Sequence, residues 1–238
     1  MRGTDADDLD LVQLGGIDVD PGPLGDPGDT LLSVIGAREL DRESWQEYQH
    51  IRGQLPASGW RVVSTQPGLD RPRVVLAAPH PEQPAAWALA YLSEKGGRWF
   101  FSANPGPVHP RPGRSARRRH LRLDWPSTPV VAPAGEPPVL SVRLTNTGRA
   151  PWSNGPDVVR VLAWILDPGT SEPLPAERYF ATTSSDHRPV ELAAGQSLVL
   201  PALIATFEPA RLPPGRYELS ALLMALNLRS SVGTLLLT

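Results

Sequence analysis

A hydroxyl, a carboxylate and an imidazole stand together in this 238-residue sequence at Ser184-Ser-Asp-His187. Serine, histidine and aspartate can act as nucleophile, base and orienting acid, but such a triad is normally assembled from segments far apart in the chain. Adjacent residues rarely reach that geometry, and short polar side chains at this spacing commonly hydrogen-bond their own loop. We therefore interpret residues 184–187 as a loop without a catalytic role.

Several other kinds of reactive site are excluded. The sequence has no Cys, which rules out disulfides, iron–sulfur clusters, cysteine nucleophiles and cysteine-based zinc sites. Lys95 is the sole lysine and is followed by Gly, so no phosphate-binding P-loop is present. The five histidines are scattered, and the zinc-protease, serine-hydrolase and dinucleotide-binding motifs are missing. We expect no catalytic, metal-binding or cofactor-binding residues, and a protein that is not an enzyme.

Arginines form the densest charged run of the chain. The run consists of Arg111, Arg114, Arg117, Arg118, Arg119 and Arg122. A guanidinium stays charged and can pair with a carboxylate or a phosphate through two N–H groups. Three uses remain open: a solvated face between domains, binding of an acidic protein or of the chain's own acidic arm, and binding of a nucleic-acid backbone. Nucleic acid is disfavoured, because the formal net charge is −2 and no recognition motif is present.

Acidic and basic residues are distributed unevenly along the chain. Residues 1–55 carry an excess of acids, residues 56–126 an excess of bases, and the remainder is nearly neutral. Residues 1–29 are rich in Asp, Pro and Gly and poor in large apolar side chains, which predicts a disordered acidic arm. The patch Leu9-Asp-Leu-Val-Gln-Leu14 is the part of this arm that can dock on a neighbouring surface.

Residues 30–105 combine helical and strand-like patterns. Asp29 or Thr30 can cap a short helix over 31–35. Ser44-Trp-Gln-Glu47 fits the capping box of a second helix, and its predicted core-facing stripe is Trp45, Tyr48, Ile51 and Leu55. Strand-like runs separated by turn residues follow at 60–65, 73–78, 86–93 and 98–103. The pattern predicts a small α+β domain with an antiparallel meander.

The order of these elements is vaguely similar to cystatin-like and nuclear-transport-factor-like domains, whose curved sheet wraps a helix. Such folds often enclose an apolar pocket, which Trp60, Trp87 and Trp99 are the candidates to line. The interpretation we favour is that the same three side chains fill a core, and the pocket stays open as the alternative. A pocket lined by these tryptophans would indicate a small-molecule-binding or enzymatic domain.

Residues 120–238 have the pattern of an antiparallel β-sandwich. Strand-like runs with Pro or Gly in nearly every gap occur at 121–125, 139–145, 158–166, 179–183, 197–204, 217–226 and 234–238. Residues 219–228 have a helix-like composition. The preceding Pro213-Pro-Gly215 turn and the alternation of Tyr217 with Leu219 favour a strand.

Three segments of this region resemble a known family. They are Val142-Arg-Leu-Thr-Asn-Thr-Gly148, Leu192-Ala-Ala-Gly-Gln-Ser-Leu198 and Leu212-Pro-Pro-Gly-Arg-Tyr-Glu-Leu219. They are similar to signature segments of bacterial immunoglobulin-like domains, including the intracellular proteinase-inhibitor (BsuPI-like) domains and adhesion-type repeats. The resemblance implies a strand leaving into a loop, a tight turn, and a Pro-Gly turn before a penultimate strand with an inward Tyr217. It implies no single function, because this sandwich serves many.

The sequence therefore predicts four parts. These are a disordered acidic arm at 1–29, a small α+β domain at 30–105, a Pro/Arg-rich connector at 106–119 and an immunoglobulin-like β-sandwich at 120–238. We expect a two-domain, non-enzymatic, protein-binding accessory or assembly component, with an unidentified protein partner. The alternatives are a small-molecule-binding or enzymatic first domain and polyanion binding by the arginines.

Source and compartment are also expectations from the sequence. Arg supplies all but one of the 23 basic residues, a bias typical of high-GC bacteria. The start, MRGTDADDLD, lacks the basic and apolar regions of a secretory signal, and no run reaches the roughly 20 apolar residues of a membrane span. We expect a bacterial cytoplasmic protein without membrane contact.

Overall fold

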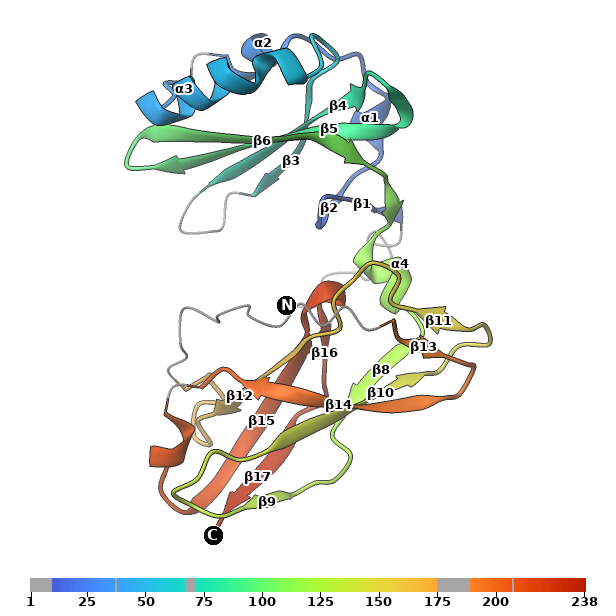
Figure 1. Ribbon diagram of the computed structural model, residues 1–238. Coiled ribbons are helices and arrows are strands. Elements are labelled where there is room, and N and C mark those ends of the chain that lie inside the picture. The colour runs from blue at the N-terminus through green and yellow to red at the C-terminus, as the bar shows by residue number, and fades with distance from the viewer. Residues whose placement is uncertain (1–9, 37, 67–71, 175–188, 207) are drawn as a thin grey trace. The chain divides into compact units, whose positions relative to one another are not determined.

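The computed structural model describes residues 10–36, 38–66, 72–174, 189–206 and 208–238 (Figure 1). These residues are β-rich and form several sheets. The chain divides into two compact units, Met1–Ala116 and Arg117–Thr238. The strand expected at 179–183 and the loop at 184–187 lie outside the described residues.

The first unit is built on a four-stranded antiparallel sheet. Its strands, in spatial order, are β3 (Arg61–Gln66), β4 (Arg73–His80), β5 (Gln83–Lys95) and β6 (Arg98–Val108). All four coincide with strands predicted from the sequence, and the meander is confirmed. The β5–β6 hairpin turns at two glycines with positive φ, Gly96 and Gly97, as a tight hairpin turn requires.

Helices cover one face of this sheet (Figure 1). They are α2 (Leu31–Ile35) and α3 (Arg42–Ile51), followed by a 3₁₀ turn at Arg52–Gln54. The expected capping box at Ser44 is wrong: Asp41 caps α3 by accepting a hydrogen bond from the Glu43 amide, and Ser44 is buried. Tyr48 and Leu55 face the core as expected, but Trp45, expected on the same stripe, is 43% exposed.

An N-terminal hairpin covers the opposite face of the sheet (Figure 1). It consists of β1 (Val12–Leu14) and β2 (Ile17–Val19), and it continues into α1 (Gly22–Gly25) and pairs with β7 (Arg111–Pro112). The expectation of a disordered arm is therefore incorrect for residues 12–25. Gly15 and Gly16 both have positive φ and close a tight turn, and the alternating pattern buries Leu14 and Val19 against the sheet.

Gly28 allows two backbone segments of this unit to meet. Next to it, Asp29 and Trp60 exchange backbone hydrogen bonds of 2.9 Å in each direction. A Cβ on Gly28 would lie 2.2 Å from the Gly59 carbonyl carbon and 2.6 Å from its Cα. Because the atoms of Gly59 at this contact belong to the backbone, no side-chain movement can relieve it. The two backbone segments would have to move apart, which would break the hydrogen bonds between Asp29 and Trp60.

We expect Gly28→Ala to destabilise the first unit by about 1–3 kcal/mol, the usual range for overpacking. Gly25→Ala is the matched control, because a Cβ there meets nothing within 4 Å. Urea unfolding of both variants measures the difference. Equal stability of the two would show that the Gly28–Gly59 contact is dispensable.

Asp29 also starts α2. Its carboxylate accepts hydrogen bonds from the Ser33 hydroxyl at 2.6 Å and the Thr30 amide at 2.7 Å, while Thr30 caps the helix. The Ser33 hydroxyl, and then the Thr30 amide, lower the pKa of this carboxyl below its ordinary 3.8. The ionised Asp29 carboxylate therefore stabilises the folded state. This stabilisation is complete above pH 3.8 and is lost as the pH falls through the lowered pKa of Asp29 in the folded state.

We expect a carboxyl-detected NMR titration of Asp29 to give a midpoint below 3.8. Ser33→Ala removes the larger cause and should move the midpoint upward. An unchanged midpoint in that variant would contradict the assignment of Ser33 as the cause.

The second unit is composed of short strands. These are β8 (Leu121–Asp124), β9 (Val130–Ala132), β10 (Leu140–Asn146), β11 (Trp152–Ser153), β12 (Val161–Leu166), β13 (Glu191–Leu192), β14 (Ser197–Ile204), β15 (Gly215–Leu223), β16 (Leu228–Arg229) and β17 (Gly233–Leu237). A helix over 219–228 does not form. β15 ends at Leu223, and only Met224–Leu226 make a 3₁₀ turn, closed by Asn227 at φ 49°.

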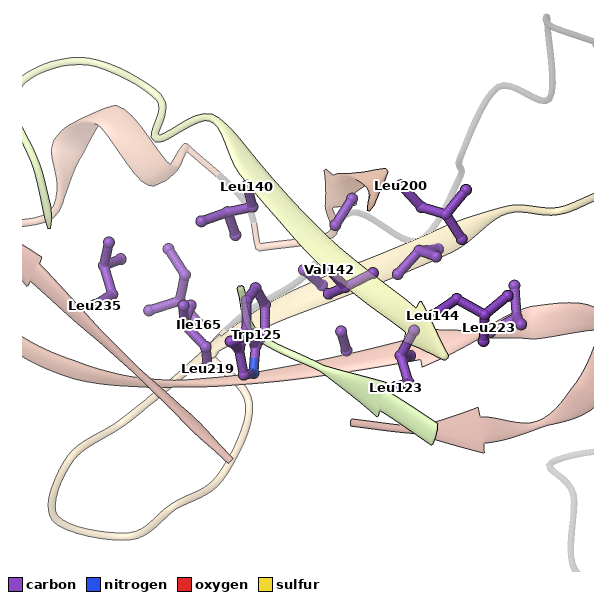
Figure 2. Close-up of a cluster of buried hydrophobic side chains, with 14 of the residues drawn as sticks. Leu123, Trp125, Leu140, Val142, Leu144, Ile165, Leu200, Leu219, Leu223 and Leu235 are labelled. Atoms are coloured by element: carbon purple, nitrogen blue, oxygen red, sulfur yellow. The ribbon is translucent and has the colours of Figure 1, made fainter. Parts of the chain in front are cut away.

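Eight of these strands form one continuous sheet, and β11 and β13 pair separately. The continuous sheet folds around one core as two layers, with β8, β10 and β14 in one and β12, β15, β17 and β9 in the other. β14 pairs with β10 along most of its length and with β12 at its end, which joins the layers. Figure 2 shows Val142 and Leu144 of one layer facing the same interior as Leu219 and Leu223 of the other. The alternation of buried and less buried residues along β10, β15 and β17 produces this single apolar core.

Asn146 connects two of the motif segments. It is 1% exposed at the end of β10, and its Nδ2 donates to the carbonyls of Ala150, Leu192 and Ala193 at 2.8, 3.0 and 3.2 Å. Its Oδ1 accepts from the Gly148 amide at 2.9 Å. One amide side chain thus holds the turn after β10 against the turn between β13 and β14.

Candidate functional site

The arginine run is divided between the two units. In the first unit, Arg111 Nε donates to Gln13 Oε1 at 2.7 Å. The Arg114 amide donates to Asp18 Oδ1 at 3.0 Å, and its guanidinium binds the same carboxylate and the Gly16 carbonyl. These arginines therefore hold the N-terminal hairpin. One alternative raised from the sequence was that the arginines bind the chain's own acidic segment. Arg114 does bind Asp18 of that segment.

The remaining arginines bind groups of the second unit. Arg117 forms a largely buried ion pair with Asp157, and Arg122 pairs with Asp124. Arg118 donates to the Leu226 and Asn227 carbonyls. Arg119 is exposed and has no partner among the described residues. The expected irregular connector at 106–119 also contains structure, since β6 reaches Val108 and Arg114–Arg118 form α4.

The three tryptophans of the expected pocket lie on different faces of the first sheet. Trp60 is fully buried under the helices, and its indole N–H donates to the Pro56 carbonyl at 2.8 Å. Trp99 packs on the same face beneath the Arg38 guanidinium, 5.2 Å from its ring centre. Trp87 packs on the hairpin face beneath Arg61. The structure does not bring these side chains together around one cavity.

A groove of about 240 Å³ does lie beside the helices of the first unit. It is lined by Thr30, Leu32, Tyr48, Arg52, Leu55 and Pro56, and by none of the three tryptophans. Within the described residues, no three acidic or histidine side chains gather where they could hold a metal ion.

The second unit carries a groove on the outward face of β12 and β15, which we call the Trp164 groove. It has a volume of about 440 Å³. It is lined chiefly by Trp164, Pro173, Leu222, Ser171, Ser220 and Arg229. The alternation that turns Ala163 and Ile165 inward turns Trp164 outward, opposite Ser220 in the register of the two strands.

A second groove on the outward face of the same layer, the Arg216 groove, has a volume of about 300 Å³. It is lined by Thr128, Pro129, Arg216, Thr234 and Leu236. Arg216 lies opposite Leu236, where β15 pairs with β17. Each of the two grooves therefore combines apolar walls, hydroxyl groups and one arginine, with no carboxylate in its lining.

The charges on this face are uneven. Arg216 and Arg229 are exposed, and neither guanidinium has an ion-pair partner among the described residues. Glu218 lies between the grooves on β15 and accepts a hydrogen bond from the Ser171 hydroxyl at 3.0 Å. Nearby Asp167 is engaged in its own turn: the Gly169 and Thr170 amides lower its pKa below 3.8.

Sequence reasoning did not identify Trp164, Arg216 or Arg229. For Trp164 the strand period indicated only that it points to the face opposite Ala163 and Ile165. Which of the two faces is outward was not readable from the continuous apolar run Val161–Leu166. The arginines gave no signal, because isolated charges on a strand are typical of any solvated face.

None of the helices among the described residues has the length and apolar character required to cross a bilayer. In comparisons with known proteins, no family model, no curated protein and no solved structure matches this chain.

Proposed function

We propose that residues 120–238 form an immunoglobulin-like sandwich. The strand order supports this proposal. In that fold one sheet holds the first, second, fourth and fifth strands, and the other holds the third, sixth and seventh. Here β8, β10 and β14 share one layer, and β12, β15 and β17 share the other, which matches this order except for the fourth strand, for which the described residues supply no counterpart. The parallel pairing of β9 with β17 adds one more strand to the second layer.

A second observation supports the same proposal. The Tyr217 hydroxyl donates to the Pro213 carbonyl at 2.9 Å, across the turn that leads into β15. A tyrosine near the start of the penultimate strand, bonded back to the backbone a few residues upstream, is typical of immunoglobulin-like sandwiches. Pro213 and Tyr217 both belong to the third segment on which the sequence resemblance rests.

We infer that the protein is a non-enzymatic binding component that recognises another protein through the outward face of β12, β15 and β17. The observation that carries this proposal is the Trp164 groove, where a partly exposed tryptophan lies beside Arg229, whose guanidinium has no partner among the described residues. Tryptophan and arginine dominate the binding energy of protein interfaces, especially where they line pockets.

The arrangement of the other candidate residues favours neither alternative. A ligand pocket would need Trp60, Trp87 or Trp99 to share a cavity, and they lie on two faces. Polyanion binding would need free guanidinium groups, and five of the six arginines in the run bind groups of the chain itself.

Photo-crosslinking in cells of the native host tests this function. We expect a photoreactive residue at Ser220, inside the Trp164 groove, to form a discrete protein adduct that Trp164→Ala removes. The matched control is the same residue at Arg143, which is exposed on the outward face of the other layer. Absence of any protein adduct, or the same adduct from both positions, would overturn the proposal.

A further inference from the structure

We propose, resting on the function above, that this face binds an extended polypeptide segment carrying two acidic side chains about six residues apart, with no acidic residue at the position two residues inward from the side chain that binds Arg216. The two grooves supply the attachment points, and Glu218 supplies the exclusion. The partner is thus identified by its charge pattern.

The spacing follows from the register of the strands. Arg216 begins the outward row of β15, which continues through Glu218 and Ser220 to Leu222. Arg229 lies beside Leu222, where β16 pairs with β15. Six residues of strand separate the two ends, roughly 20 Å at about 3.4 Å per residue. An extended partner covers the same length in about six residues, and residues i and i+6 of an extended chain project to the same side.

The chemistry of each end selects a carboxylate. A guanidinium presents two parallel N–H groups that match the oxygens of Asp or Glu. Because neither Arg216 nor Arg229 has a partner among the described residues, binding does not require an internal ion pair to break first. Trp164, Leu222 and Leu236 provide apolar walls for the intervening side chains, and Ser220 and Thr234 offer hydroxyls to a backbone.

The second position of the row rejects acidic groups. Glu218 lies between the two arginines, two residues from Arg216, and a carboxylate placed over it would meet a like charge. This arrangement also distinguishes a polypeptide from a nucleic acid. A nucleic-acid strand carries a phosphate at every nucleotide, so it would place negative charge over Glu218 as well as at the two ends. A peptide can keep the residue over Glu218 neutral or basic.

The test is selection of a random twelve-residue peptide display library on the full-length protein. We expect enriched sequences to carry Asp or Glu at two positions six apart, with no acidic residue at the position two residues inward from the acid that binds Arg216. A synthetic peptide of that pattern should bind about tenfold more tightly than its Gln-substituted version, the factor expected for a charge-assisted hydrogen bond. Adding Glu at that inward position should weaken binding by a similar factor.

Substitutions on this face test the roles of Arg216 and Arg229. Arg216→Glu and Arg229→Glu should each weaken the two-acid peptide at least about tenfold, and the double variant should prefer the matching peptide with Lys in place of both acids. Arg143→Glu is the matched control and should not change binding. All three positions are exposed, so unchanged thermal unfolding will show that the variants fold.

The outcomes separate this inference from the proposed function. Peptides that bind at the Trp164 groove without the acidic spacing would overturn the charge pattern and leave protein recognition intact. Failure to enrich any peptide, together with the absence of an adduct from Ser220, would overturn both.

Discussion

Replacing Trp60 with alanine should destabilise the first unit by about 3–5 kcal/mol, the range for truncating a large buried aromatic side chain. Trp60 has no exposed surface, packs with residues of α2, α3, β4 and β5, and binds the Pro56 carbonyl through its indole N–H. The variant loses the packing and also leaves a buried carbonyl without its donor. Both effects act in the same direction.

Trp45→Ala is the matched control, since Trp45 is 43% exposed on α3 and contacts Tyr48 at a ring separation of 5.5 Å. We expect it to cost less than about 1 kcal/mol. Hydrogen exchange of peptides from β4 and β5 measures the difference, because the most protected amides report the free energy of unfolding. Trp60→Ala should speed their exchange by roughly two to four orders of magnitude. Similar exchange in both variants would contradict the role of Trp60 in stabilising this core.

Asn146→Ala should destabilise the second unit by about 2–4 kcal/mol. The side chain is almost fully buried, and its removal takes a donor from the Ala150, Leu192 and Ala193 carbonyls and the acceptor from the Gly148 amide. Of the three carbonyls, Ala193 keeps a hydrogen bond from the Gln196 amide at 3.0 Å. Unsatisfied buried polar groups each cost about 1–3 kcal/mol, with partial relief where the turns relax toward solvent. Asparagine is the one side chain of this size with two donors and an acceptor in this arrangement.

The control for Asn146 is Gln196→Ala in the adjoining turn. Gln196 also uses its amide, accepting a hydrogen bond from the Ala193 amide at 2.8 Å, but it is exposed and water can replace it. We expect a loss below about 1 kcal/mol. Exchange rates of peptides from β10 and β14 distinguish the two variants. A Gln196→Ala effect as large as that of Asn146→Ala would show that the turn, and not the buried amide, holds the segments together.

Both experiments test residues that stabilise the fold, and these differ from the residues that we propose for recognition. The residues most noticeable in the sequence are engaged internally: Arg111 and Arg114 hold the hairpin, Arg117 pairs with Asp157, and Trp60 fills a core. The surface that we propose for recognition consists of residues that are ordinary in the sequence, such as Ser220 and Arg229. Their significance comes from sharing one outward face.

Much of the fold could be predicted because local patterns agree with the tertiary structure. The run 197–204 is predicted and observed as a strand, since a short apolar run bounded by turn residues favours one. The N-terminal hairpin was missed for an equally physical reason. Its composition is that of a disordered segment, and the short alternation Val12–Leu14 and Ile17–Val19 around two glycines is stable only because the sheet supplies an apolar face.

The amino-acid sequence by itself determined the positions of the long strands, the turns between them and the exclusion of cysteine and P-loop chemistry, because periodicity, turn residues and residue types are local properties. Tertiary structure alone decided which charges are neutralised and which stay free. Arg114 and Arg216 are the same residue type in the sequence; one meets Asp18 across 96 residues, and the other faces outward beside a groove. Such pairings depend on long-range packing, which no local spacing encodes.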